Sequence, residues 1–214
     1  MNPRRRTLVA ALGLLPLAGY AQPRLPAPGV DYSELKPRQP VEAQGKIEVL
    51  EFFWYGCPHC YTLEPLLEKW VARLPADVQF RPVPAVLNEG WAREAAVYYS
   101  FEALGVLERL HRPFFDAIHR DRLNTRDPEK LADWLRKQDV DPKRYEEAFK
   151  SFGVQSKVRR AMQLSAAYRI DGTPALAVQG RYTVSAEQGR TQQGMLDTVD
   201  YLIGLARKGG QASG

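Results

Sequence analysis

The chain contains two cysteines among its 214 residues, Cys57 and Cys60, and two residues separate them. The preceding run from Ile47 to Trp54 is almost entirely apolar and predicts a buried strand, whereas Tyr61 to Arg73 has the apolar spacing of a helix. The pair therefore lies where a strand turns into a helix. A thiol at a helix N-terminus faces unpaired N–H groups and the positive end of the dipole, which favour the thiolate. Cysteines three residues apart can also form a disulfide, so the spacing predicts a redox-active pair.

Three other interpretations of the segment Cys57-Pro58-His59-Cys60 are weaker. A zinc site needs four ligands, and this segment supplies only three in a poor arrangement. Covalent haem attachment requires histidine directly after the second cysteine, where this chain has Tyr61. A structural disulfide is the remaining alternative, but closing so short a loop removes little entropy from the unfolded chain. We therefore expect redox chemistry, with no metal and no cofactor other than the Cys57–Cys60 disulfide.

The first 21 residues have the composition of a secretory signal peptide. Arg4 to Arg6 form a basic start, Leu8 to Ala18 is an apolar run too short to span a bilayer, and Gly19 to Ala21 provides small residues for cleavage. The segment Arg5 to Leu8 faintly resembles a twin-arginine signal, so the export route stays open. No cysteine follows the apolar run, and we expect no lipid anchor at the cleavage site.

The charge balance gives no reason to expect a nucleic-acid partner. The chain has 30 basic and 25 acidic residues, and three of the arginines lie in the expected signal peptide. The remainder would carry a net charge of only +2, which is too small for an electrostatic footprint on nucleic acid. No later stretch is apolar over a length that would span a membrane.

The predicted elements begin as a unit of a parallel sheet. After a proline-rich arm at 22–44, with an edge strand near Tyr32 to Leu35, the pattern predicts strand, helix and strand, the last over Asp77 to Leu87. From residue 90 to about residue 154 it predicts helices only. Two of these begin at Asp127-Pro128 and Asp141-Pro142, an N-cap followed by proline at the first helical position.

The second half of the chain returns to a sheet. Gly153 is expected to end the last inserted helix, and a longer helix is predicted from Ser156 to Tyr168. A β-hairpin that turns at Gln179-Gly180 follows, and a last helix is predicted from Gln192 to Arg207. The tail from Gly209 onward is expected to be disordered.

The run Val49 to Phe53 followed by Cys57 to Tyr61 resembles the DsbA family of thioredoxin-fold thiol:disulfide oxidoreductases. The segment Gly172 to Ala175 matches the cis-proline loop of that family, and the helical block matches its inserted domain. The resemblance extends from about Lys46 to Arg207 and implies an α/β thioredoxin fold with an inserted all-helical domain. The implied divisions are a signal peptide at 1–21, a discontinuous thioredoxin-like domain at 22–89 and 155–214, and the inserted domain at 90–154.

The resemblance also implies roles for the residues of the site. Cys57 would be exposed and exchange disulfides with substrate, while Cys60 would be buried and resolve the mixed disulfide. Between them lie Pro58 and His59, and the His59 ring would stabilise the Cys57 thiolate. A low thiol pKa and an oxidising couple are known properties of this family. The side chains expected to offer a peptide-tolerant surface are those of Trp54, Tyr55 and Tyr61.

Two further positions complete the expected site. Pro174 is implied to be cis, which would place the Thr173 backbone where it can pair with a substrate strand, although trans is the commoner state of an ordinary X–Pro bond. Glu51 lies within an apolar strand and is expected to carry the proton of Cys60. Whether Arg81 reaches Glu51 is open. For the remaining histidines, His111 and His119, we favour structural roles.

The sequence thus predicts a periplasmic dithiol oxidase that introduces disulfide bonds into reduced exported proteins. Its reoxidising partner would resemble DsbB, a quinone-linked membrane protein, and the chain would act as a monomer. One alternative is a reductase or isomerase of the same fold, although the known isomerases add a dimerisation domain for which the arm at 22–44 is too short. Another is a non-enzymatic module that binds peptides or delivers metal, in which the cysteines are incidental.

Overall fold

The computed structural model describes residues 24–211, so the expected signal peptide lies outside the described residues. Five strands form one mixed sheet in the order β1-β5-β4-β2-β3. Their bounds are β1 (Ser33–Glu34), β2 (Ile47–Phe53), β3 (Val78–Pro84), β4 (Ala175–Val178) and β5 (Tyr182–Ser185). β2 pairs parallel with β3 and antiparallel with β4, so the strand that leads to the cysteines has a neighbour on both sides.

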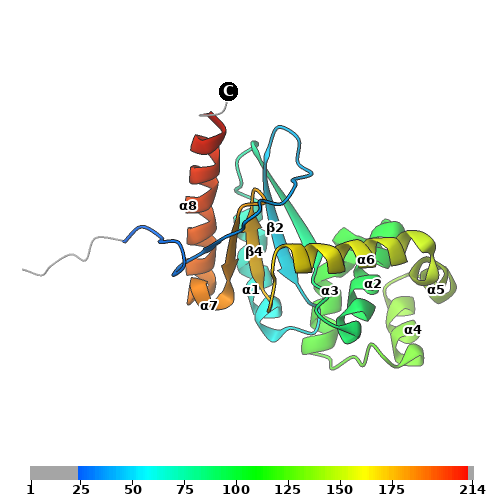
Figure 1. Cartoon of the computed structure of the whole chain (residues 1–214). Coiled ribbons are helices and arrows are strands. Elements are labelled where there is room, and N and C mark those ends of the chain that lie inside the picture. Colours follow the sequence, from blue (N-terminus) through cyan, green and yellow to red (C-terminus); the bar gives the residue numbers. More distant parts are fainter. Residues whose placement is uncertain (1–23, 212–214) are drawn as a thin grey trace, which may run out of the picture.

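Helices cover both faces of this sheet (Figure 1). Their bounds are α1 (Pro58–Val71), α2 (Glu89–Ala103), α3 (Leu107–His119), α4 (Pro128–Lys137), α5 (Pro142–Lys150), α6 (Phe152–Ala167), α7 (Ala186–Gly189) and α8 (Gln192–Gln211). Because side chains alternate along a strand, β2 supplies two cores. Val49 packs with α1 and α8 in one core, whereas Leu50 and Phe52 pack with α2 and α6 in the other. In Figure 1, α8 stands on one side of the sheet and α2 to α6 gather on the other.

Several local predictions are confirmed. Asp127 and Asp141 cap α4 and α5 by accepting hydrogen bonds from backbone N–H groups of the first turn, and a proline follows each at the first helical position. The hairpin of β4 and β5 turns at Gln179 and Gly180, which both have positive φ, at 52° and 59°. This conformation matches the twist of the flanking strands. The expected edge strand is β1, which pairs with β5.

Four element predictions differ from the structure. Gly153 does not end a helix: α5 ends at Lys150, and the Ser151 side chain caps α6 by accepting a hydrogen bond from the Val154 N–H. Gly153 therefore lies in the first turn of α6. The last helix continues to Gln211 rather than ending near Arg207. The expected disorder is therefore wrong for 209–211, and 212–214 lie outside the described residues. The short helix α7 was not predicted, and α1 begins at Pro58, three residues before Tyr61.

The inserted helices α2 to α5 follow β3 and precede α6 in the chain. The helix α6 passes without a break through residues 154 and 155, where the sequence suggested that the inserted domain ends. The division into domains stays a prediction. Across residues 24–211, no helix combines the length and apolar character needed to cross a membrane.

Candidate active site

Cys57 is the N-cap of α1. Its backbone is extended, with φ −86° and ψ 115°, and its sulfur accepts a hydrogen bond from the Cys60 N–H at 3.3 Å. The sulfur thus occupies the position that an oxygen takes in an ordinary N-cap. Pro58 follows at the first helical position, where a backbone N–H would have no partner within the helix. The local sequence therefore fixes one thiol at the positive end of the helix, which favours a negative charge on its sulfur.

The two cysteines are both free thiols in the structure, and their pKa values are shifted in opposite directions. Hydrogen bonds from the Cys60 side chain, from the Thr173 side chain and from the backbone N–H groups of Cys60 and His59 lower the pKa of Cys57 to about 5, and they outweigh its burial. Burial raises the pKa of Cys60 well above its ordinary value, and the neighbouring Cys57 and Glu51 raise it further. At neutral pH Cys57 is therefore a thiolate and Cys60 a thiol.

Cys57 is less accessible than the sequence suggested. Its exposed fraction is 6%, compared with 0% for Cys60. The Cys57 sulfur lies 3.3 Å from the carbonyl oxygen of Thr173, in the loop before β4. The expected cis bond between Thr173 and Pro174 is present; Pro174 is buried and Thr173 is half-buried. The loop therefore covers one side of the sulfur that is to react.

Pro58 and His59 are both exposed on the first turn of α1. The backbone N–H of His59 contributes to the low pKa of Cys57, and its carbonyl oxygen accepts a hydrogen bond from the Thr62 hydroxyl at 3.1 Å. Within residues 24–211, the His59 ring has no hydrogen bond or ion pair. A direct role of the ring in stabilising the thiolate stays a prediction.

Glu51 is completely buried in β2, and neither of its carboxylate oxygens has a hydrogen-bond partner among the described residues. Burial, together with the charges of Glu64 and Cys57, raises the pKa of Glu51 well above its ordinary value. Arg81 does not pair with Glu51. Arg81 lies in register with Leu50, the residue before Glu51 in β2, whose side chain points to the opposite face. The Arg81 guanidinium contacts Glu48 at 3.7 Å instead.

The three aromatic residues expected to form a peptide-binding surface do not lie together on the surface. Tyr55 is only 1% exposed, because its ring packs edge-on against Phe114 and Phe115 of α3. The prediction for Tyr55 is therefore wrong. Trp54 and Tyr61 are half-buried, and Trp54 stacks on the ring of Trp91 with the centroids 4.4 Å apart.

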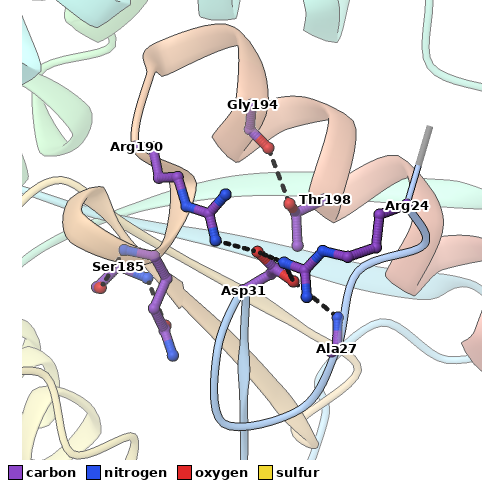
Figure 2. Close-up of polar contacts among 8 residues, drawn as sticks. Arg24, Ala27, Asp31, Ser185, Arg190, Gly194 and Thr198 are labelled. Atoms are coloured by element: carbon purple, nitrogen blue, oxygen red, sulfur yellow. Dashed lines mark hydrogen bonds and ion pairs between the residues drawn. The ribbon is translucent and has the colours of Figure 1, made fainter. Parts of the chain in front are cut away.

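A groove of about 290 Å³ lies beside the cysteines, between the first turn of α1 and the α7–α8 junction. It is lined by His59, Pro174, Ala186, Arg190, Thr191, Gln192 and Met195. The Asp31 carboxylate accepts hydrogen bonds from the side chains of Arg190 and Arg24 (Figure 2). Sequence reasoning missed the residues from α7 and α8, since they lie far from the cysteines in the chain and form no motif.

The described residues contain no group of three or more histidine, cysteine, aspartate or glutamate side chains arranged to hold a metal ion. The arrangement instead provides a thiolate at the start of α1, a buried thiol that hydrogen-bonds to it, and a buried carboxyl group close enough to raise the pKa of that thiol. Thiol–disulfide exchange needs these features: a thiolate that is a good leaving group, and a second thiol that can form a disulfide with it.

Comparisons with known proteins agree with this chemistry. A sequence model of the DSBA-like thioredoxin domain matches residues 48–197. The thiol:disulfide interchange protein DsbA of Bordetella parapertussis is 42% identical over 205 residues, covering 94% of this chain and 96% of that protein. The DsbA of Burkholderia cepacia is 38% identical over 198 residues, covering 92% and 93%. The crystal structure of Pseudomonas aeruginosa DsbA superposes with a TM-score of 0.81 at 36% identity, covering 86% of this chain and 95% of that one.

Proposed function

The chain belongs to the DsbA family and is a thioredoxin-fold thiol:disulfide oxidoreductase that introduces disulfide bonds, and we propose that it does so through Cys57 and Cys60 on reduced proteins exported to the periplasm. The observation that carries this proposal is the asymmetry between the two thiols. The pKa of Cys57 is lowered to about 5, whereas that of Cys60 is raised. A stabilised Cys57 thiolate favours the reduced enzyme, and the disulfide is correspondingly a strong oxidant.

The reaction begins when a thiolate of the client protein attacks the sulfur of Cys57. The bond between Cys57 and Cys60 breaks, its electron pair goes to the Cys60 sulfur, and Glu51 supplies the proton that converts this sulfur to a thiol. A second client thiolate then attacks the client sulfur of the mixed disulfide, and Cys57 leaves as a thiolate. The client has been oxidised by two electrons and the enzyme reduced by two.

Other residues would orient the client. The groove beside His59 and Pro174 would hold the chain next to the reacting cysteine, and the backbone at Thr173 would pair with it as an added strand. Reoxidation would use a membrane protein resembling DsbB that passes electrons to a quinone. We place the enzyme in the periplasm as a monomer, with residues 1–21 removed as a signal peptide and with the redox-active disulfide as its only redox group.

The equilibrium potential of the Cys57–Cys60 pair against a glutathione buffer tests the direction of the reaction. An oxidase should have a potential more oxidising than about −200 mV, whereas a value near the −270 mV or so of thioredoxin would replace the oxidase by a reductase. Cys57→Ser provides the second arm. If this variant still supports the full activity of the protein on client polypeptides, the cysteines are incidental and the protein is a binding module.

A further inference from the structure

A buried row of polar side chains leads from the active-site strand to helix α3. Glu64 of α1 is 3% exposed, and its Oε1 has no hydrogen-bond partner among the described residues. Nε2 of His111 lies 3.6 Å from this oxygen. On the other side, Glu64 raises the pKa of Glu51 through its charge. The mechanism described above uses Glu51 but leaves Glu64 and His111 without a role.

The Tyr55 hydroxyl can be a hydrogen-bond partner of His111 in both charge states of the ring. The Tyr55 hydroxyl lies 2.8 Å from Nδ1 of His111. Burial raises the pKa of Tyr55 well above its ordinary value, so the hydroxyl keeps its proton. It can donate a hydrogen bond to Nδ1 of the neutral ring and accept one from the Nδ1–H of the protonated ring. In the neutral ring the other nitrogen, Nε2, then carries the hydrogen, and this is the nitrogen that faces Glu64.

A cleft connects this row with solvent. It has a volume of about 480 Å³, which is enough for several water molecules, and it opens between α1, α3 and β3. Glu51, Glu64 and His111 all line it. The side chain of His111 is 18% exposed, whereas that of Glu64 is 4% exposed and Glu51 is completely buried. His111 is therefore the most accessible of the three and stands at the solvent end of the row.

We propose that His111 is the residue that exchanges protons between the water in this cleft and the buried acids Glu64 and Glu51. As Glu51 gives its proton to the Cys60 sulfur, its carboxyl group takes up a proton from the protonated ring of His111, by way of Glu64 or a water in the cleft, so that no charge is left on the buried Glu51. The ring then takes a proton from solvent. The proposal deepens the proposed function, since it rests on Glu51 as the proton donor. His111 touches neither cysteine and acts only through the two glutamates.

Charged groups of both signs surround the cleft. Beyond Glu64, the titratable and charged groups that face the cleft from each element are Glu51 of β2, Glu68 of α1, Tyr98 of α2, and Glu108 and Arg112 of α3. Arg112 is the one cation among these lining residues, and an imidazole can exchange protons in the physiological pH range. Without His111, Glu51 would have to take its proton from the water of the cleft alone.

The test is the single-turnover reduction of the oxidised enzyme by dithiothreitol, followed over a range of pH. This reaction requires protonation of Cys60 whether the enzyme is an oxidase or a reductase in the cell. In His111→Ala we expect the rate at neutral pH to fall roughly tenfold, less than the 10² or more of a direct general acid. Free imidazole should restore the rate, because the open cleft admits it, and the rescue should follow the concentration of protonated imidazole.

His119→Gln is the matched control. His119 lies on the same helix and also holds Tyr55, by donating from Nε2 to the backbone carbonyl oxygen at 2.8 Å, but it does not line the cleft. Its replacement tests the positioning of Tyr55 alone, and imidazole should not change its rate. A proton relay changes the rates of reduction and of reoxidation by the same factor, and it therefore leaves the equilibrium potential unchanged. The potential of His111→Ala against glutathione should equal that of the wild type.

An unchanged rate in His111→Ala, or a loss that imidazole does not restore, would overturn the role of His111. A shifted potential would also overturn it, because the ring would then act on the stability of the thiols. If His111→Ala does not fold, His111→Gln keeps a partner for the Tyr55 hydroxyl and should lose the wild-type pH dependence of the rate. The proposed function fails on a different result, a thioredoxin-like potential of the wild-type pair.

Discussion

The low pKa of Cys57 should depend most on its neighbour, Cys60. The hydrogen bond from the Cys60 side chain is the largest of the contributions that lower this pKa to about 5. Cys60→Ala removes this donor and leaves the Thr173 side chain and the backbone N–H groups in place. Cys60→Ser keeps a donor at the same position. The pair of variants therefore separates the side-chain hydrogen bond from the effect of the helix N-terminus.

The magnitude follows from the strength of a hydrogen bond to a charged group, about 1.5–3 kcal/mol. Since one pKa unit corresponds to about 1.4 kcal/mol, losing this bond should raise the pKa of Cys57 by roughly one to two units. In Cys60→Ala the pKa should therefore lie at roughly 6–7, still below the ordinary value because the N-terminal amides of α1 remain. In Cys60→Ser it should stay near 5.

The assay is the ultraviolet absorbance of the thiolate against pH, which has a single source because each variant contains one cysteine. The rate of alkylation by iodoacetamide against pH gives an independent midpoint. A midpoint that stays near 5 in Cys60→Ala would refute the reasoning. The amides of α1 would then carry the stabilisation alone, and the opposite shifts of the two thiols would be unconnected.

Two further predictions concern stability. The pKa of Cys57 is lower in the folded than in the unfolded protein, so its thiolate stabilises the reduced folded protein at high pH. This stabilisation is lost as the pH falls through 5. The oxidised protein has no thiolate and therefore lacks this stabilisation. Urea unfolding of both forms should therefore show the reduced form losing about 3 kcal/mol relative to the oxidised form between pH 7 and pH 4.5, and a pH-independent difference would contradict this. Gly56→Ala should destabilise the protein by about 1–3 kcal/mol, because a Cβ there would lie 2.3 Å from the Trp54 ring, whereas Gly153→Ala, with open space around it, should not destabilise it. Equal stabilities of these two variants would show that Trp54 can move aside freely.

Much of the site could be read from short segments of the sequence. The order strand, cysteine, proline and helix is local, and local backbone geometry is enough to place Cys57 as an N-cap and Cys60 within the first turn. The same holds for Asp127 and Asp141, since a cap depends only on the residues of the first turn. The resemblance to a known family supplied the cis state of Thr173–Pro174, for which the residues alone favoured trans.

Contacts between distant segments were decided only by the tertiary structure. Thr173 and Cys57 meet across 116 positions of the chain. Whether Tyr55 faces solvent or α3 depends on how the inserted helices pack, and this packing buried it. Whether Arg81 can reach Glu51 depends on the register of β2 and β3, which placed the two side chains on opposite faces of the sheet. The sequence by itself determined where the thiols lie on their helix, because backbone direction is a local property. Which groups surround them depends on packing between segments that no local pattern records.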